Sequence, residues 1–174
     1  GLKPHVAAGF IGDGRVEGTS KLLPGIEERT TSPRKGFGIW QHTGGRRTNL
    51  VAFARKHNAS PADAIIQTKF VLHELDTYES MAATKINATT NAKDAAKMIA
   101  IYFERPNAIA LRKSMGKRQS YAEDADKEFM RFYNASHAAP TQKAPVVNDN
   151  NPRTVKVKSE TTVSLSDILN GTKS

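Results

Sequence analysis

The chain has 174 residues, of which 38% are hydrophobic and 25% are charged, and this composition suits one globular domain with some chain left over. Its 26 lysines and arginines outnumber its 17 acidic residues and give a formal net charge of +9, so the surface should attract nucleic acid, anionic lipid or an acidic cell-wall polymer. The absence of cysteine excludes disulfides, thiolate metal sites and a cysteine nucleophile.

The first predicted helix covers about residues 3–13. Pro4 suits a first helical turn, and the apolar residues that follow recur at helical spacing on one face. We expect this helix to break on Gly12 and Gly14 and to present the carboxylate of Glu17 at the rim of a cleft. Residues 18–38 are rich in glycine, proline, threonine and serine, which favours loops or a short irregular hairpin.

Residues 36–47 form a glycine-rich block that reads Gly-Phe-Gly-Ile-Trp-Gln-His-Thr-Gly-Gly-Arg-Arg. Small residues here allow close backbone approach, and they alternate with an aromatic platform, an amide and two guanidinium groups. This set suits a polysaccharide that carries amide and carboxylate groups. The alternative is that the aromatic residues belong to the core and the arginines begin a solvated helix. The residues concerned are Phe37, Trp40, Gln41, His42, Arg46 and Arg47.

Two helices are predicted after this block. The first begins near Arg46, and Asn58 is its expected stop. The second begins at Ser60, which is the expected N-cap, with Pro61 in the first turn and Asp63 near the positive end of the helix dipole. Its apolar members, including Ile65, should face the core.

Three more helices are predicted further along the chain. A short one covers about residues 78–86. The next begins near Asn91 and must end before Pro106, because proline disfavours α geometry in the residue that precedes it. The sequence Ser120-Tyr-Ala-Glu123 is a capping-box pattern and predicts the start of the last core helix.

Glu17 is the candidate general acid. A lone glutamate at a helix end is usually solvated, but apolar residues before it would desolvate the carboxyl and favour its protonated form, as cleavage of a glycosidic bond requires. The second carboxylate has to be Glu27 or Glu28, because no aspartate occurs between Asp13 and Asp63. If neither reaches the site, a one-acid mechanism remains, in which an acetamido or 6-hydroxyl group of the substrate takes the second role.

Other kinds of site receive less support. His73-Glu74 begins like a zinc-protease helix, but Thr77 stands where the second histidine should be, so we predict no metal site. No phosphate-loop or dinucleotide fingerprint occurs, and we predict no cofactor. A basic cluster is open to nucleic acid, but few aromatic residues interleave with it, so a solvated face suited to an anionic wall is preferred. The cluster comprises Arg105, Arg112, Lys113, Lys117 and Arg118.

The composition changes after Ala135 to alanine, proline, asparagine, threonine and lysine. We therefore predict a domain over residues 1–137 and a linker over 138–152. Residues 153–174 begin with a period-2 alternation and are predicted to be an extended tail that docks on a partner's sheet or groove, with a disordered tail as the alternative. We expect no membrane span, and the first residues lack the apolar region of a signal peptide, so another carrier should deliver the protein.

Three separated motifs together resemble the phage tail lysozyme family, a lysozyme-like group of virion-associated peptidoglycan hydrolases. The order and spacing of these motifs agree over roughly residues 3–134. Gly18 and His42 depart from the usual family pattern, which has serine and tryptophan there. The motifs are Ala7-Ala-Gly-Phe-Ile-Gly-Asp with Glu17-Gly, the glycine-rich block through Leu50, and His73-Glu-Leu with Tyr102-Phe-Glu-Arg-Pro106.

The resemblance implies an α+β, mainly α, lysozyme-like domain with an extended C-terminal tail and a cleft that binds peptidoglycan. It implies that Glu17 protonates the oxygen between N-acetylmuramic acid and N-acetylglucosamine, that Gln41 places the glycan or the attacking water, and that Glu28 or Glu27 stabilises charge on the sugar. Substrate contacts would come from Phe37, Trp40, His42, Arg46 and Arg47.

The same resemblance implies a place in the virion, in the phage tail or as an internal component, and action in the host periplasm and cell wall. Local perforation of the wall during genome entry is the implied role, and residues 153–174 would bind other virion proteins. Two alternatives stay open: a catalytically inactive wall-binding virion protein on the same scaffold, and a nucleic-acid-binding protein.

Overall fold

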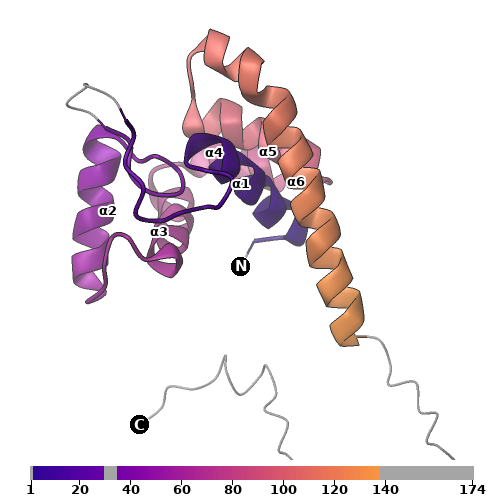
Figure 1. Cartoon of the computed structure of the whole chain (residues 1–174), viewed down its shortest axis with the longest axis horizontal. Coiled ribbons are helices and arrows are strands. Elements are labelled where there is room, and N and C mark those ends of the chain that lie inside the picture. The colour runs from indigo at the N-terminus through magenta and orange to yellow at the C-terminus, as the bar shows by residue number, and fades with distance from the viewer. Residues whose placement is uncertain (1, 30–34, 138–174) are drawn as a thin grey trace, which may run out of the picture. The chain divides into compact units, whose positions relative to one another are not determined.

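The computed structural model describes residues 2–29 and 35–137, and within these ranges most of the chain is helical (Figure 1). The prediction of a mainly helical fold is confirmed. The β component of the described ranges consists of two isolated bridges, which join Phe37 to Glu27 and to His42. The expected linker and docking tail lie outside the described residues. The helices are α1 (Pro4–Glu17), α2 (Gly44–Lys56), α3 (Ala64–Thr77), α4 (Ser80–Asn87), α5 (Ala92–Met98), the π-helix η1 (Ile99–Glu104) and α6 (Ala108–His137).

Helix α1 is longer than predicted. It passes through Gly12 and Gly14 and ends at Glu17, so the expected break at the glycines is wrong. The reason is packing: a Cβ at Gly12 would lie 2.5 Å from the carbonyl oxygen of Arg118 and 2.6 Å from the amide of Ala122 in α6. The glycines let two helix backbones meet, and this close contact offsets their poor helix propensity.

Helix α6 also begins earlier than predicted. Asn107 caps it, because its Oδ1 accepts from the backbone amides of Ile109 and Ala110 at 3.1 and 2.9 Å. Ser120 therefore lies inside the helix, and the predicted start there is wrong. Residues 108–119 are mostly strong helix formers, and they extend the helix upstream of the capping-box pattern. Helix α6 lies along both α1 and α5 (Figure 1).

Helix α3, by contrast, begins later than predicted. Asp63 is the N-cap, and its Oδ1 accepts from the amide of Ile66 at 2.9 Å. Ser60 instead accepts from the amide of Ala62 in the preceding turn, so its prediction as N-cap is wrong. Ile65 is 67% exposed, so the prediction that it faces the core is wrong, whereas Ile66 and Phe70 are buried.

The predicted ends of two helices agree with the structure. Helix α2 ends at Lys56, and Asn58 follows with a φ of 51°, a left-handed conformation that asparagine adopts more readily than most residues. Helix α5 is capped by Asn91, widens into η1, and stops at Arg105, just before Pro106. The wider η1 brings Glu104 into the interior, and such π-helical turns are frequent at functional sites.

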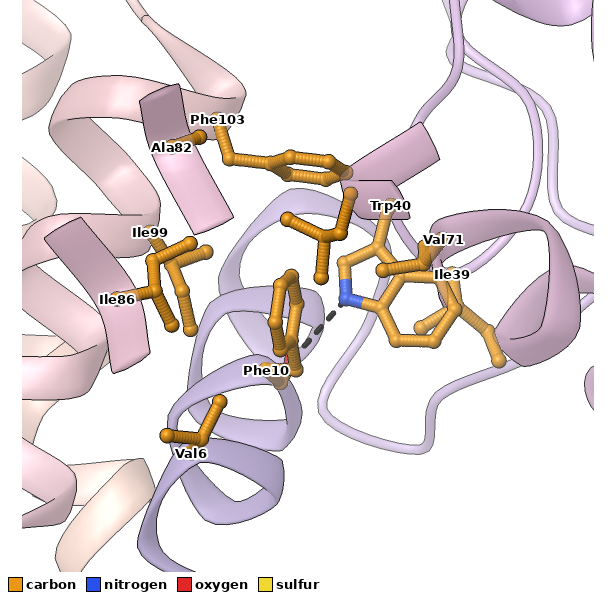
Figure 2. Close-up of a cluster of buried hydrophobic side chains, with 10 residues drawn as sticks. Val6, Phe10, Ile39, Trp40, Val71, Ala82, Ile86, Ile99 and Phe103 are labelled. Carbon is orange, nitrogen blue, oxygen red and sulfur yellow. Dashed lines mark hydrogen bonds between the residues drawn. The ribbon is translucent and has the colours of Figure 1, made fainter. Parts of the chain in front are cut away.

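An aromatic cluster ties the glycine-rich block to α1 (Figure 2). The ring of Phe10 meets Phe103 edge to face at a centroid distance of 5.4 Å and Trp40 at 6.4 Å. The indole Nε1 of Trp40 donates to the carbonyl oxygen of Phe10 at 3.1 Å. These contacts bury the indole and fix the loop beside the C-terminal half of α1. None of the described helices is long and apolar enough to cross a bilayer.

The contact between α1 and α6 predicts opposite effects for two glycine substitutions. Gly12→Ala should destabilise the protein by about 1–3 kcal/mol, because the added methyl group overlaps the α6 backbone. Gly116→Ala, at an exposed position of α6 with open space around it, should stabilise by about 0.5–1 kcal/mol. Urea unfolding of both variants measures the difference, and equal effects would contradict the close helix contact.

Candidate functional site

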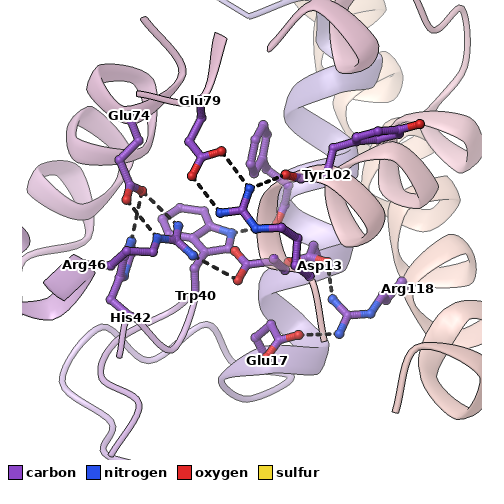
Figure 3. A network of polar contacts seen from close by, with 12 residues as sticks. Asp13, Glu17, Trp40, His42, Arg46, Glu74, Glu79, Tyr102 and Arg118 are labelled. Atoms are coloured by element: carbon purple, nitrogen blue, oxygen red, sulfur yellow. Dashed lines mark hydrogen bonds and ion pairs between the residues drawn. The ribbon is translucent and has the colours of Figure 1, made fainter. Parts of the chain in front are cut away.

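Glu17 ends α1 and is bound by a buried arginine of α6. Arg118 Nη2 donates to Glu17 Oε1, and Arg118 Nη1 donates to Asp13 Oδ1 (Figure 3). The Arg118 side chain is 2% exposed and that of Asp13 is fully buried, while the Glu17 side chain is 23% exposed. Asp13 and Glu17 lie one turn apart on α1, so a single guanidinium bridges both carboxylates and orients Glu17.

A second arginine organises the opposite side of the network. Arg46 donates to both carboxylate oxygens of Glu74 at 2.8 and 2.9 Å, and its Nη1 lies 3.3 Å from Glu104 Oε2. Its guanidinium also covers the ring of Phe103 at 4.5 Å. Because these contacts join α2, α3 and η1, Arg46 serves the structure, and its prediction as a substrate-binding residue is not supported by its geometry.

Burial controls the proton affinities in this network. It raises the pKa of Asp13 to about 7, against the opposing effect of Arg118, and it raises the pKa of Glu104 well above the usual range. Burial acts in the same direction on Glu74, but the hydrogen bonds and charges of Arg46 and His42 together outweigh it, and the pKa of Glu74 is lowered. The network therefore holds protonated and ionised carboxyl groups close together.

Two predicted substrate contacts are buried. The His42 ring is fully buried with its Nε2 3.5 Å from Glu74 Oε2, and burial lowers the pKa of His42, which keeps the imidazole neutral. Trp40 is 6% exposed and packs on Phe10. Neither ring is accessible to a glycan, so the prediction of both as substrate contacts is wrong. Trp40 fills the hydrophobic cluster, whereas His42 faces the carboxylate of Glu74.

The loop glutamates are held by the glycine-rich block. Arg47 pairs with Glu27, and its guanidinium covers the partly buried ring of Phe37 at 5.0 Å. Glu28 is exposed, and its Oε2 accepts from the amide of Gly36 at 3.2 Å. The described contacts thus join both glutamates to this block, and none joins either to Glu17.

Gln41 lies in a tight turn next to the end of α1. Its φ is 44°, and its Nε2 donates to the carbonyl oxygen of Gly38 at 2.7 Å. The same carbonyl would lie 3.2 Å from a Cβ at Gly18, and the carbonyl oxygen of Ile39 would lie 2.7 Å from it. Gly18 therefore has no room for a side chain, and its backbone contact brings Glu17 and Gln41 to the same turn.

Sequence reasoning overlooked the buried partners of Glu17. Arg118 was assigned to a solvated basic cluster, which is wrong because its guanidinium is buried, and Arg105 of that cluster pairs with Glu79 at 2.7 Å. The four-residue spacing of Asp13 and Glu17 places both on one helical face, so Asp13 could have been found from the sequence. Nothing in the sequence indicates Arg118, because it lies so far along the chain from Glu17. Among the described residues, no group of three or more histidine, aspartate or glutamate side chains is placed to hold a metal ion.

The sequence profile of the phage tail lysozyme family matches residues 1–129. The chain belongs to this family. The match spans every charged residue of the network, from Asp13 to Arg118, and ends within α6. Curated proteins give no match to the chain. Membership makes this a lysozyme-like, virion-associated protein of a class that acts as glycosidases on peptidoglycan.

Loss of either of two ion pairs near the site should lower the stability of the fold by different amounts. Glu74→Gln leaves the partly buried Arg46 without its bidentate partner and should destabilise the fold by about 3–5 kcal/mol. Glu27→Gln removes an exposed partner of Arg47 and should cost less than about 1 kcal/mol. Chemical unfolding at pH 7 measures both, and a Glu74→Gln protein as stable as wild type would contradict the role given to Arg46.

The raised pKa of Asp13 predicts how stability depends on pH. The unfolded chain releases this proton near pH 3.8 and the native chain near pH 7, so the native state binds more protons between these values. Asp13 therefore lowers the free energy of unfolding as pH rises from about 4 to 7, by on the order of 4 kcal/mol. Urea unfolding across this range should show the decline in wild type and a smaller one in Asp13→Asn. Equal slopes would contradict the assignment.

Proposed function

We propose that this protein cleaves the β-1,4 bond between N-acetylmuramic acid and N-acetylglucosamine in host peptidoglycan, with Glu17 as the general acid. The observation that carries the proposal is accessibility. Of the four carboxyl groups in the described network, Glu17 has a side chain that is 23% exposed, whereas those of Asp13, Glu74 and Glu104 are 0%, 3% and 6% exposed. By its exposure, Glu17 is therefore the one of these four carboxyl groups that a glycan can contact.

The bridge through Arg118 gives Glu17 a defined orientation before substrate binds. A general acid must give a proton to the leaving oxygen and then carry negative charge. The guanidinium of Arg118 stands ready to stabilise that charge, and Asp13 holds the guanidinium in place from the buried side. In the Michaelis complex, Glu17 has to turn its protonated oxygen toward the glycosidic oxygen, while Arg118 stays anchored on Asp13.

The second catalytic task falls to the loop or to the substrate. Glu27 is engaged by Arg47, which leaves Glu28 as the loop carboxylate that would stabilise positive charge on the sugar ring. The alternative is that an acetamido or 6-hydroxyl group of the glycan performs this role. Gln41 fixes the turn beside Glu17 through Gly38, and in this proposal its partly buried amide orients the glycan or the attacking water.

The surface of the loop supplies the remaining substrate contacts in this proposal. Arg47 has a side chain that is 35% exposed and can meet a carboxylate of the peptide stem without unfolding the site. The partly buried ring of Phe37 lies beside it, under the Arg47 guanidinium, and in this proposal adds an apolar contact. Carried in the virion, the enzyme would open the wall locally while the phage genome enters, and residues 153–174 would attach it to other virion proteins.

An inactive wall-binding domain is the second candidate. The ion pair between Glu17 and Arg118 favours it, because the same contact in a purely structural role would hold Glu17 away from chemistry. The two candidates differ in one respect only, which is whether removing the Glu17 carboxyl removes glycan cleavage.

Glu17→Gln should reduce the release of muropeptides from purified sacculi by about 10²-fold to 10⁴-fold, because the amide cannot donate the required proton. Glu123→Gln, at a surface glutamate whose side chain is 46% exposed on α6, is the matched control and should release muropeptides like wild type. Mass spectrometry of the released ends identifies the reaction: reducing muramic acid marks hydrolysis and anhydro-muramic acid marks transglycosylation. Undiminished release by Glu17→Gln would leave the binding domain as the better account.

A further inference from the structure

The buried network contains more carboxyl groups than guanidinium groups. Within the described residues it brings the carboxyl groups of Asp13, Glu17, Glu74 and Glu104 together with the guanidinium groups of Arg46 and Arg118. The imidazole of His42 is neutral, since burial lowers its pKa. Four ionised carboxylates would leave uncompensated negative charge in a region where charge is costly. The network therefore has a physical reason to keep a proton.

Two oxygen atoms of the network are candidates to hold that proton. Asp13 Oδ2 and Glu104 Oε1 are both buried without a hydrogen-bond partner, although the other oxygen of each carboxyl is bound by an arginine. After burial itself, the charge of Asp13 has the largest effect on the Glu104 carboxyl. The two carboxyl groups thus lie close enough to repel each other, and each presents one oxygen that lacks a donor.

We propose that Asp13 and Glu104 share one proton between Asp13 Oδ2 and Glu104 Oε1, and that Glu104 is thereby a positioning residue for Glu17. A single proton on either oxygen donates to the other, so it satisfies both orphan atoms and removes one unit of negative charge. The remaining oxygens keep their arginines, Asp13 on Arg118 and Glu104 on Arg46. The positioning role of Glu104, unlike the shared proton, rests on the proposed function of Glu17.

The charged groups around the pair come from every neighbouring element. Arg46 of α2 and Arg118 of α6 each bind one member, and Glu17 of α1 adds negative charge to both. The others are Glu74 of α3, which shares Arg46, and Arg105, which is bound to Glu79. Since both arginines are already engaged, no cation in the described network is free to balance a second ionised member of the pair.

The shared proton affects Glu17 through Arg118. While Asp13 holds it, the guanidinium of Arg118 is divided between a weakened Asp13 partner and Glu17. When the proton leaves, Asp13 and Glu104 both carry full negative charge and attract the guanidinium toward the interior, away from Glu17. Burial raises the pKa of Asp13 to about 7 and raises that of Glu104 well above its usual range, so the pair keeps its last proton at neutral pH and loses it as pH rises further. Glycan cleavage should therefore decline as pH rises above about 7, because Glu17 then loses its orientation.

Infrared spectroscopy tests the shared proton without relying on activity. Wild type at neutral pH should show the carbonyl band of a buried protonated carboxyl group, and the band should disappear when pH is raised far enough above neutrality to remove the last proton of the pair. Glu104→Gln and Asp13→Asn should each lack this band, because their amides donate to the remaining carboxylate and replace the proton. Absence of the band in wild type would overturn the proposal, and so would a band that persists in both variants. The wild-type spectrum decides the matter even if a variant fails to fold.

The pH profile of muropeptide release tests the positioning role. Wild type should lose activity as pH rises above about 7 and the pair gives up its last proton. Glu104→Gln should stay active and lose this step. Glu104→Ala should be impaired at every pH, because it offers no donor to Asp13. An unchanged step in Glu104→Gln would overturn the positioning role. A wild type that shows the infrared band but cleaves no glycan at any pH would instead refute the proposed function and leave the shared proton standing.

Discussion

One buried guanidinium connects the two helices on which the site depends. Arg118 of α6 binds Asp13 and Glu17 of α1 at once, so the helix that carries the candidate acid is fixed to the longest helix of the domain. Removing a charge from the interior of such a network leaves its partner unpaired, which is far more destabilising than losing a surface pair. The position of Glu17 is therefore determined by buried electrostatics, while its side chain stays partly exposed.

The glycines of the first helix and the loop make this arrangement possible. Gly12 lets the backbone of α6 approach α1 closely enough for Arg118 to reach both carboxylates, and Gly18 lets the turn at Gly38 pack against the end of α1. A side chain at either position would separate elements that the charge network joins. The glycine-rich block thus serves close packing, and its one tryptophan, Trp40, fills the core rather than a sugar-binding cleft.

The sequence carries local information well and long-range information poorly. The cap at Asn91 and the stop before Pro106 follow from short-range backbone chemistry, and both were predictable. The glycine at position 12 was misinterpreted as a helix break, because only a neighbouring helix explains it. Capping patterns at Ser60 and Ser120 failed because competing caps at Asp63 and Asn107 are satisfied in the fold.

The same contrast between local and long-range information holds for the candidate site. Glu17 and Gln41 could be selected from the sequence, and the structure places both beside the same turn. Arg118 could not be selected, since nothing in a basic surface pattern distinguishes the one guanidinium that turns inward. Phe37 and His42 also looked alike in sequence, yet one is partly exposed beside Arg47 and the other is sealed against Glu74. Burial decides between binding and packing roles for such residues, and burial is a property of the whole fold.

The central claim is that glycan binds where Glu17 emerges from the buried network. An NMR titration of the Glu17→Gln protein, which should not cleave glycan, with soluble peptidoglycan fragments tests this claim directly. The account predicts that the largest amide shifts fall at Gly18, Gly38 and Gln41, with little change along the exposed end of α6. Shifts confined to that end of α6, or none at saturating glycan, would contradict it.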